Sequence, residues 1–345
     1  MKGGCVVRRK LVVGLLAVSV LLTFGLAGCG QNKPAATSVD NVVKKVVIKV
    51  GYENNPGEPL DLSMKKMAEI VNEKSKGSME LVLFPSSQLG SKKDLTQQMQ
   101  LGTNVMTLTD ASFLADYVPD MGILSGPYLT KDYKAIIKLT ETDWWKDLEK
   151  KLGDKGLHVV TTNWHYGDRS ILSKKPVTKP ADLSGMKIRV PDAKLMIESL
   201  KAMGATPTPM PLGDVYTSLS QGVIDGVENP LAVLYGGKFH EAVKELSLTK
   251  HMNMVTQWIV GQKFYATLTP EQQKILDEAG DEAGLYMNII GEEADKKALD
   301  AMKAAGVKVT EVDQAAFAEA VKPVYQKFPA WTPGLYDKVQ ALLTK

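Results

Sequence analysis

The stretch from Met186 to Pro230 alternates between two kinds of pattern and restricts the fold more than any other part of the chain. It predicts a short strand ending near Arg189, a helix closed by Gly204, a proline-rich extended run, a second helix and a strand before Asn229-Pro230. Strands that alternate with helices predict a parallel sheet covered by helices, because each helix carries the chain back to start the next strand.

The rest of the sequence shows the same alternation. Predicted strands cover Val46–Val50, Met79–Phe84, Val105–Thr109, Leu157–Trp164, Val223–Val227 and parts of Met252–Tyr265. Predicted helices include Ser91–Leu101, Lys131–Leu152, a long helix from Pro230 to about Leu248, and another over Pro270–Ala305. Because 345 residues exceed one typical core, we expect an α/β protein of two domains with doubly wound sheets.

The N-terminus carries the pattern of an export signal. Four basic residues among the first ten precede an apolar run from Leu11 to Ala27, which is short for a spanning helix of roughly 20 residues. The run leads into Gly28-Cys29 and resembles a bacterial lipobox. We predict a lipoprotein signal peptide at residues 1–28, lipidation of Cys29 and a flexible tether at residues 29–44. The alternative is an uncleaved anchor with an incidental cysteine.

This signal places the protein outside the cytoplasm as a membrane-anchored lipoprotein, in the periplasm or on the outer face of the cytoplasmic membrane. It also changes the charge of the mature chain. Without its four basic residues, 38 of the 42 Lys and Arg remain against 39 Asp and Glu, a net charge of −1. A near-neutral chain gives no electrostatic reason to bind nucleic acid. One cysteine would remain, at the lipid site, so we expect no internal disulfide.

Sequence patterns that support catalysis or cofactor binding are absent. The four histidines, at positions 158, 165, 240 and 251, lack the spacing of a metal site, and the chain has no HExxH, P-loop, GxGxxG or GxSxG pattern. We therefore expect no enzyme activity, no metal and no cofactor.

Arg189 and Arg169 are candidates for binding an anion. Ligands of open α/β sheets bind beyond the carboxyl ends of the strands, where Arg189 is predicted, and a guanidinium group can bind a carboxylate through two hydrogen bonds. Arg169 follows a predicted strand end and a glycine. The alternative for each is a surface arginine paired with a nearby acid.

Other residues near the predicted strand ends could contact a ligand. Asn229 precedes Pro230 and could cap a helix, bind an anion at the helix N-terminus, or both. Asp110 and Glu53 could accept hydrogen bonds from hydroxyl or amine groups, although ordinary caps and turns use the same residues. Trp164, Leu212 and Tyr216 are weaker candidates, because such side chains more often pack in a core.

The whole chain after Cys29 resembles the DctP-type solute-binding proteins of TRAP transporters. The runs that carry the resemblance are FPSSQLGSKKDL, YVPDMGILSGPYL, NWHYGDRSILSKKPV, DLSGMKIRVPDA, MGATPTPMP, VYTSLSQGVIDGVENP and KFHEAVKELSLTKH. The resemblance implies a two-domain periplasmic-binding fold with a long connecting helix and a hinge. It also implies a receptor that closes on an organic acid and delivers it to an ion-coupled membrane permease.

The resemblance assigns roles to the candidate residues. Arg189 in KIRVP matches the family's arginine that clamps the substrate carboxylate, Arg169 in YGDR a second substrate-contacting arginine, and Asn229 in GVENP an asparagine near the carboxylate. Asp110 and Glu53 fall where family members vary, so we expect them to tune specificity. The run from GDRSI to VENPLAVLY most resembles members that bind sugar acids such as uronates or diketogulonate.

We predict domain I at residues 45–166 plus about 250–290 and domain II at 167–249 plus about 291–345, with the ligand cleft between them. We expect a monomer whose partners are a small carboxylate and the permease subunits. Three alternatives stay open: a binding lipoprotein of an ABC importer, a sensory lipoprotein, and a lipid-anchored enzyme acting on a sugar acid.

Overall fold

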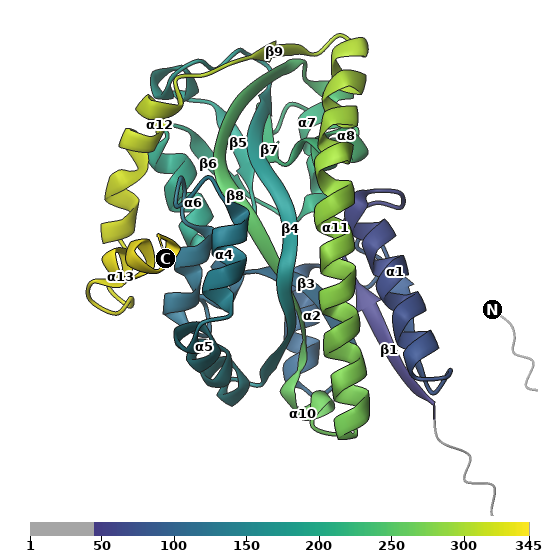
Figure 1. Cartoon of the computed structure of the whole chain (residues 1–345). Helices are drawn as coiled ribbons and strands as arrows, with labels where there is room; N and C mark the ends of the chain where they lie inside the picture. Colours follow the sequence, from purple (N-terminus) through teal and green to yellow (C-terminus); the bar gives the residue numbers. More distant parts are fainter. Residues whose placement is uncertain (1–44, 345) are drawn as a thin grey trace, which may run out of the picture. The chain divides into compact units, whose positions relative to one another are not determined.

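In the computed structural model, which describes residues 45–344, the strands join in one nine-stranded sheet (Figure 1). Its order is β2-β1-β3-β8-β4-β7-β5-β6, and β9 pairs with β8. The strands are β1 (Val46–Gly51), β2 (Met79–Phe84), β3 (Val105–Asp110), β4 (Leu157–Ser173), β5 (Lys187–Val190), β6 (Thr206–Pro209), β7 (Gly226–Asn229), β8 (Glu245–Gly261) and β9 (Lys308–Thr310). The predicted signal peptide, the tether and Cys29 lie outside the described residues.

Helices cover the sheet and connect its strands. The α-helices are α1 (Pro59–Lys74), α2 (Lys92–Gln100), α3 (Ala111–Leu114), α4 (Tyr133–Thr140), α5 (Asp143–Asp154), α6 (Lys194–Ala202), α7 (Val215–Ser220), α8 (Leu231–Gly236), α9 (Phe239–Ala242), α10 (Gln262–Tyr265), α11 (Pro270–Ala304), α12 (Gln314–Val321) and α13 (Leu335–Leu343). Short 3₁₀ helices are η1 (Pro119–Ser125), η2 (Pro180–Leu183), η3 (Leu212–Asp214) and η4 (Lys322–Gln326). No helix between residues 45 and 344 combines the length and apolarity needed to cross a membrane.

The sheet has two parallel halves, as the alternating sequence predicts. In the first half, β1 pairs in parallel with β2 and β3. In the second half, β5 pairs in parallel with β6 and β7. The pairing is parallel because a helix between successive strands returns the chain to the edge where the previous strand began. These helices are α1 and α2 in the first half and α6 and α7 in the second. The predicted α/β class is confirmed.

Two 17-residue strands, β4 and β8, run antiparallel to each other and join the halves (Figure 1). At one end β8 pairs with β3, and at the other end β4 pairs with β7. Their mutual register shifts at four places, including the steps between His165 and Gly167 and between Arg169 and Ile171. The chain therefore crosses between the halves through two continuous strands.

Two predictions for this region are wrong. The strand predicted over Leu157–Trp164 does not end at Trp164, because β4 continues to Ser173 with Gly167 inside it at a φ of +122°. That conformation suits glycine, and a Cβ atom there would lie 2.8 Å from the Cβ of Pro230. The helix predicted from Pro230 to about Leu248 ends at Gly236, because Lys238 adopts a left-handed conformation (φ 57°) and β8 begins at Glu245.

The long helix α11 spans both halves of the sheet and matches the predicted segment Pro270–Ala305 closely (Figure 1). Its first turn has a capping box between Thr269 and Gln272, with Pro270 at the first helical position. The helix packs against α1 and β4, and Trp164 of β4 donates its indole N–H to the carbonyl of Gly280 at 2.9 Å. The prediction of a long helix over this segment is confirmed.

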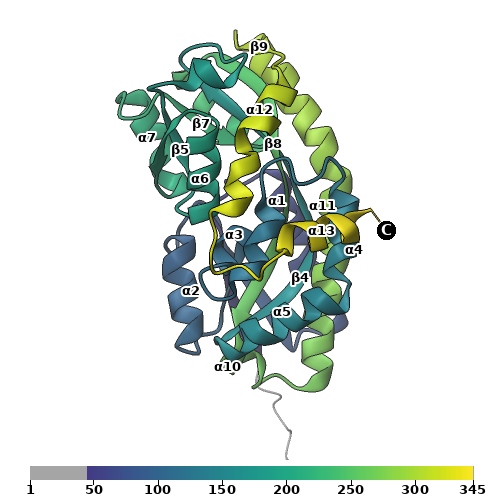
Figure 2. The same cartoon turned by 90° about the vertical axis from the view of Figure 1, so that its left-hand side faces the viewer.

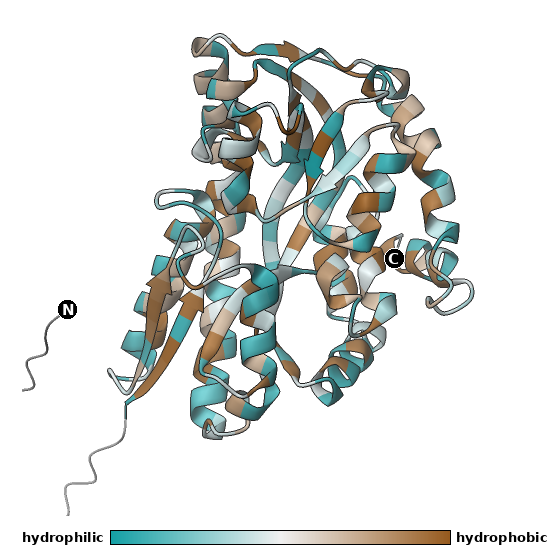
Figure 3. Ribbon diagram, turned by 180° about the vertical axis from the view of Figure 1, so that it is seen from behind, coloured by the Kyte–Doolittle hydropathy of each residue, from teal (hydrophilic) through white to brown (hydrophobic). Residues whose placement is uncertain are grey.

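The apolar residues gather around the sheet (Figure 3). One cluster joins β1, β3 and β8 to α1 and α11, and another lies in the second half around Leu172, Val227 and Leu246. The C-terminal segment packs beside α4 (Figure 2), where Tyr325 and Gln340 donate hydrogen bonds to the carbonyls of Pro127 and Leu129 at 2.7 and 3.0 Å. The predicted domain boundaries stay a prediction.

Candidate functional site

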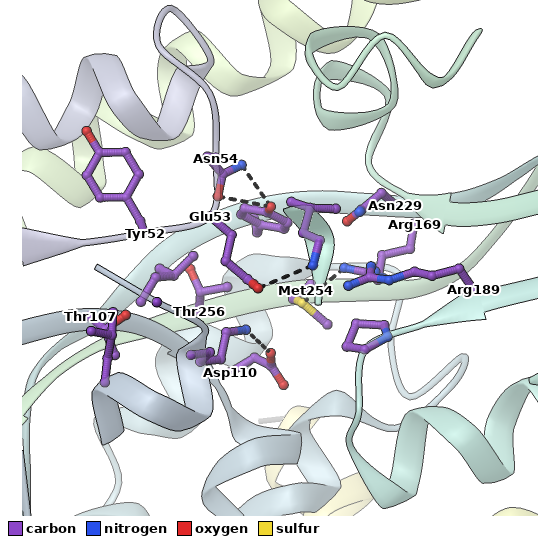
Figure 4. A pocket seen from close by; sticks show the side chains of 17 residues that line it. Tyr52, Glu53, Asn54, Thr107, Asp110, Arg169, Arg189, Asn229, Met254 and Thr256 are labelled. Atoms are coloured by element: carbon purple, nitrogen blue, oxygen red, sulfur yellow. Dashed lines mark hydrogen bonds and ion pairs between the residues drawn. The ribbon is translucent and has the colours of Figure 1, made fainter. Parts of the chain in front are cut away.

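A cavity lies where the two sheet halves meet, beside the middle of β4 and β8 (Figure 4). It encloses about 550 Å³ of space not filled by atoms, including its opening to solvent. Six of the eight residues predicted to contact a ligand line this cavity: Arg189, Arg169, Asn229, Asp110, Glu53 and Leu212. Residues that lie up to 176 positions apart in the sequence are thus brought together, because the strand ends of both halves converge here.

The other two predicted residues lie elsewhere. Trp164 is fully buried between β4, β8 and α11, where it packs edge-on against Trp258. Tyr216 of α7 is 40% exposed, and its hydroxyl donates to Glu241 at 3.1 Å. Neither side chain lines the cavity in this structure.

Arg169 is buried on β4 and is fully engaged by a carboxylate. Its Nε and Nη2 atoms donate to the two carboxylate oxygens of Glu228 on β7, the second at 2.7 Å, and Nη2 also donates to the Glu228 carbonyl at 3.0 Å. His251 lies 3.3 Å from the same carboxylate. Burial disfavours the charged form of Glu228, but Arg169 and His251 outweigh this effect and lower its pKa to about 2. The charge of Arg169 is therefore neutralised within the protein by Glu228.

Arg189 is equally buried, on β5, but lacks a carboxylate partner within 4.0 Å among residues 45–344. Its Nε and Nη2 atoms donate to the carbonyl of Met210 at 3.0 and 2.7 Å, which fixes the plane of the guanidinium group. Burial lowers the pKa of Arg189 to about 10, although the Glu53 carboxylate acts in the opposite direction. The rest of the guanidinium group faces the cavity (Figure 4). A buried guanidinium group without a carboxylate partner favours binding of an anionic ligand.

Asn229 is the last residue of β7 and lines the cavity beside the two arginines (Figure 4). The predicted capping role is wrong, because Pro230 occupies the N-cap position of α8 and no side chain caps that helix. No other residue in the described range forms a hydrogen bond with the side-chain amide of Asn229. Its amide can therefore donate to a ligand oxygen.

Asp110 combines a structural role with a place in the wall. One carboxylate oxygen caps α3 by accepting from the backbone N–H of Ser112 at 3.1 Å, and the other accepts from Nζ of Lys92 at 3.1 Å. Lys92 lies at the start of α2, and its ammonium group sits 4.4 Å from the ring centre of Phe113. The Asp110 charge is thus balanced within the protein.

Glu53 belongs to the loop after β1 and points across the cavity toward the arginines (Figure 4). Its Oε1 atom accepts from the backbone N–H of Leu212 at 3.3 Å, a contact that joins the two sheet halves. None of the cationic side chains described lies within salt-bridge distance of Glu53. Glu53 keeps acceptor capacity that faces the cavity.

Several residues of the site were not among those predicted. Glu228 stands next to Asn229, yet its role as the partner of Arg169 depends on β4 and β7 pairing, which no local signal gives. Lys92 lies in the first turn of α2, and Tyr166 accepts a hydrogen bond from Asn54 at 2.9 Å. The side chains of Met254 and Thr256 complete the floor from β8. No group of metal-ligating side chains occurs within residues 45–344.

A two-domain periplasmic-binding fold, with a cavity between its parts and a buried cation directed into it, defines the class of extracytoplasmic solute-binding proteins. Residues 50–330 match the family model described as bacterial extracellular solute-binding protein, family 7 (DctP). The chain belongs to this family, the DctP-type TRAP solute-binding proteins, as its resemblance predicts.

Similar proteins are known from several bacteria. The chain is 34% identical over 303 residues to the 2,3-diketo-L-gulonate-binding periplasmic protein YiaO of Escherichia coli, covering 87% of this chain and 89% of the relative. Its structure is similar to TRAP periplasmic solute-binding proteins solved from Ochrobacterium anthropi with L-fuconate (48% identity) and from Actinobacillus succinogenes with L-galactonate (45%). In both cases the TM-score is 0.86 and the match covers 87% of this chain and 99% of the other.

A protein from Fusobacterium nucleatum with bound sn-glycerol-3-phosphate is also similar, at 38% identity and a TM-score of 0.84, covering 87% of this chain and 97% of the other. These relatives are named as periplasmic binding proteins. Together they present two kinds of anion, a carboxylate and a phosphate monoester.

Proposed function

We propose that this protein is the extracytoplasmic receptor of a TRAP transporter and that it binds a sugar acid through Arg189. The observation that carries the proposal is the buried guanidinium group that has no acidic partner in the described chain and faces the cavity. A ligand carboxylate would supply the missing charge through two parallel hydrogen bonds, and the Asn229 amide would donate to the same group. The sugar acids bound by similar proteins support this ligand class.

Binding would couple to closure of the two domains. Arg189 and Asn229 lie on the second sheet half, whereas Glu53 and Lys92 come from the first. A ligand held by both walls interacts more strongly with the closed form and shifts the population toward it. Two contacts join the sheet halves near the cavity. Glu53 accepts a hydrogen bond from the N–H of Leu212, and Lys93 forms an ion pair with Asp192 at 2.6 Å. The closed receptor would then deliver its ligand to the ion-coupled permease.

The N-terminal pattern adds a location to this proposal. Lipidation of Cys29 would tether the receptor to the membrane through residues 29–44 and keep it near its permease. Mass spectrometry of the intact protein purified from membranes should show a diacylglycerol on Cys29, whereas Cys29→Ala should carry no diacylglycerol. A wild-type protein recovered unmodified from the soluble fraction would contradict the anchor.

A ligand panel tests the receptor function directly. Thermal unfolding of the mature protein would be followed with L-fuconate, L-galactonate, D-glucuronate, malate and the neutral sugars L-fucose and L-galactose. A ligand at a thousandfold excess over its dissociation constant adds about 4 kcal/mol of stability and should raise the midpoint by several degrees. We expect shifts with sugar acids only. A shift confined to the neutral sugars, which have no carboxylate, would overturn the proposal.

A further inference from the structure

The charged side chains of the cavity fall into pairs with two exceptions. Arg169 is neutralised by Glu228, and Lys92 is paired with Asp110 at 3.1 Å. At the mouth of the cavity, Lys93 is paired with Asp192 at 2.6 Å.

Within residues 45–344, the lining groups left without an opposite charge at salt-bridge distance are one cation, Arg189, and one anion, Glu53. They come from opposite walls, and Glu53 points toward the arginines in Figure 4. The cavity thus offers one charge to attract an anion and one to oppose a second.

We propose that the cavity selects acids with a single negative charge and a neutral, hydroxylated remainder, and that Glu53 determines this selectivity. The inference rests on the proposed function, since it refines which sugar acids the Arg189 site accepts. It separates aldonates and uronates, each with one carboxylate, from aldarates and phosphate monoesters, which bring two negative charges at neutral pH.

The hydrogen-bonding capacity of Glu53 supports this selectivity. A carboxylate can only accept hydrogen bonds, so sugar hydroxyl groups satisfy it, whereas a second ligand carboxylate or phosphate cannot. One of its oxygens already accepts from the N–H of Leu212, which holds the side chain in the cavity. Two like charges held this close repel each other, because a bound ligand displaces solvent from the space between them.

Lys92 does not offset the repulsion between Glu53 and a second ligand anion. Its side chain is 14% exposed, and its ammonium group lies 3.1 Å from the carboxylate of Asp110, whose side chain is 3% exposed. A second ligand anion would have to compete with Asp110 for Lys92 and would leave that buried carboxylate without its partner. Arg169 is held in the same way by Glu228. The remaining hydrogens of the Lys92 ammonium group can still donate to ligand hydroxyls.

The experiment uses three acids that share one carbon chain and one configuration and differ only at C6. They are L-fuconate with a methyl group, L-galactonate with a hydroxymethyl group, and galactarate with a second carboxylate. Isothermal titration of the intact mature protein at pH 7.5 would give their affinities, with sn-glycerol-3-phosphate as the phosphate probe. We expect galactarate and the phosphate to bind about a hundredfold more weakly than L-galactonate, the scale of an enclosed like-charge contact.

Glu53→Gln tests the assigned residue, because glutamine keeps the size and can still accept from the N–H of Leu212. We expect this variant to reduce the preference for L-galactonate over galactarate to less than about tenfold. The control is Asp192→Asn, which removes the same charge at the mouth of the cavity, where the acid is already paired with Lys93. This control should weaken all three acids alike and leave their ranking unchanged. Thermal unfolding of both variants would verify that they fold.

Each outcome has a definite meaning. If the wild type binds galactarate as tightly as L-galactonate, the single-charge selectivity is wrong while the receptor function stands. If the preference is the same in Glu53→Gln as in the wild type, or falls equally in Asp192→Asn, the assignment to Glu53 is wrong. If none of the acids binds, the proposed function fails together with the inference.

Discussion

The two walls of the cavity differ in how they hold their polar groups. On one wall, Arg169 of β4, Arg189 of β5 and Asn229 of β7 stand on paired strands and are almost completely buried. On the first half, Glu53 lies in a loop and Lys92 in the first turn of α2, and both side chains are partly exposed. Strands position a group rigidly, whereas loops accept sequence changes at small cost. The strand wall therefore suits an invariable feature such as the carboxylate, and the loop wall suits recognition of the rest of the ligand.

The two arginines sharpen this contrast within one wall. Both are 2% exposed, yet Arg169 is neutralised by Glu228 and Arg189 makes hydrogen bonds only to a carbonyl group among the described residues. One arginine stabilises the folded protein, and the other retains its capacity to bind an anion. A variant that removes the partner of Arg169 should therefore mainly lower stability, whereas a variant of Arg189 should mainly lower the affinity for the ligand.

The largest effect should follow the loss of the Arg169 partner. Glu228→Gln leaves a buried guanidinium group without a countercharge, and removing one partner of a buried ion pair costs about 3–5 kcal/mol. Urea unfolding of the ligand-free protein should show this loss in the free energy of unfolding. The matched variant Arg189→Ala should change stability by no more than about 1 kcal/mol, because it removes a buried charge along with two hydrogen bonds. Equal losses in both variants would contradict the contrast.

A somewhat smaller effect should appear in the pH dependence of stability. The pKa of Glu228 is lowered to about 2 in the folded protein from an ordinary value of 4.5. A lowered folded-state pKa gives stability that is fully present above pH 4.5 and is lost as the pH falls toward 2. The stability difference between the wild type and Glu228→Gln should therefore shrink over that range. A difference that stays constant from pH 6 to pH 3 would show that the charge of Glu228 is not the cause.

The smallest effect should come from the ion pair at the mouth of the cavity. Lys93 and Asp192 join the two sheet halves, but their side chains are 48% and 52% exposed, so solvent and salt weaken the interaction. Lys93→Ala should lower the affinity for a sugar acid by less than about fivefold, and the loss should disappear at 0.5 M salt. A loss that persists at high salt would mean that Lys93 contacts the ligand itself.

The sequence predicts the parallel halves of the sheet because short strands alternate there with helices along the chain. It also predicts helices that begin near Ser91 and at Pro270, since both starts follow local capping rules: Ser91 is the N-cap of α2, and Thr269 and Gln272 form a capping box at the start of α11. These elements depend on neighbours within a few residues. Five of the six predicted residues that line the cavity lie near strand ends that local patterns can place, whereas Arg169 lies inside β4.

The remaining features depend on contacts distant in the sequence. The middle of β4 is polar around Gly167, so the predicted strand stops at Trp164, but pairing with β8 continues the strand to Ser173. Only the second part of β8 is predicted, within Met252–Tyr265. Its first part, from Glu245, falls partly in the helix predicted to about Leu248, and buried polar residues such as His251 interrupt its apolar pattern. The partner of Arg169 could not be predicted either, because Glu228 meets it only after β4 and β7 have paired.

The central claim is that Arg189 supplies the cation that binds the ligand carboxylate. Isothermal titration of L-galactonate into the wild type, Arg189→Ala and Arg189→Lys tests it most directly. We predict a loss of roughly a hundredfold or more for alanine, with the protein still folded, and an intermediate loss for lysine, which keeps the charge but not the planar fork. A loss of only a few-fold for Arg189→Ala would remove Arg189 from the site and contradict the account.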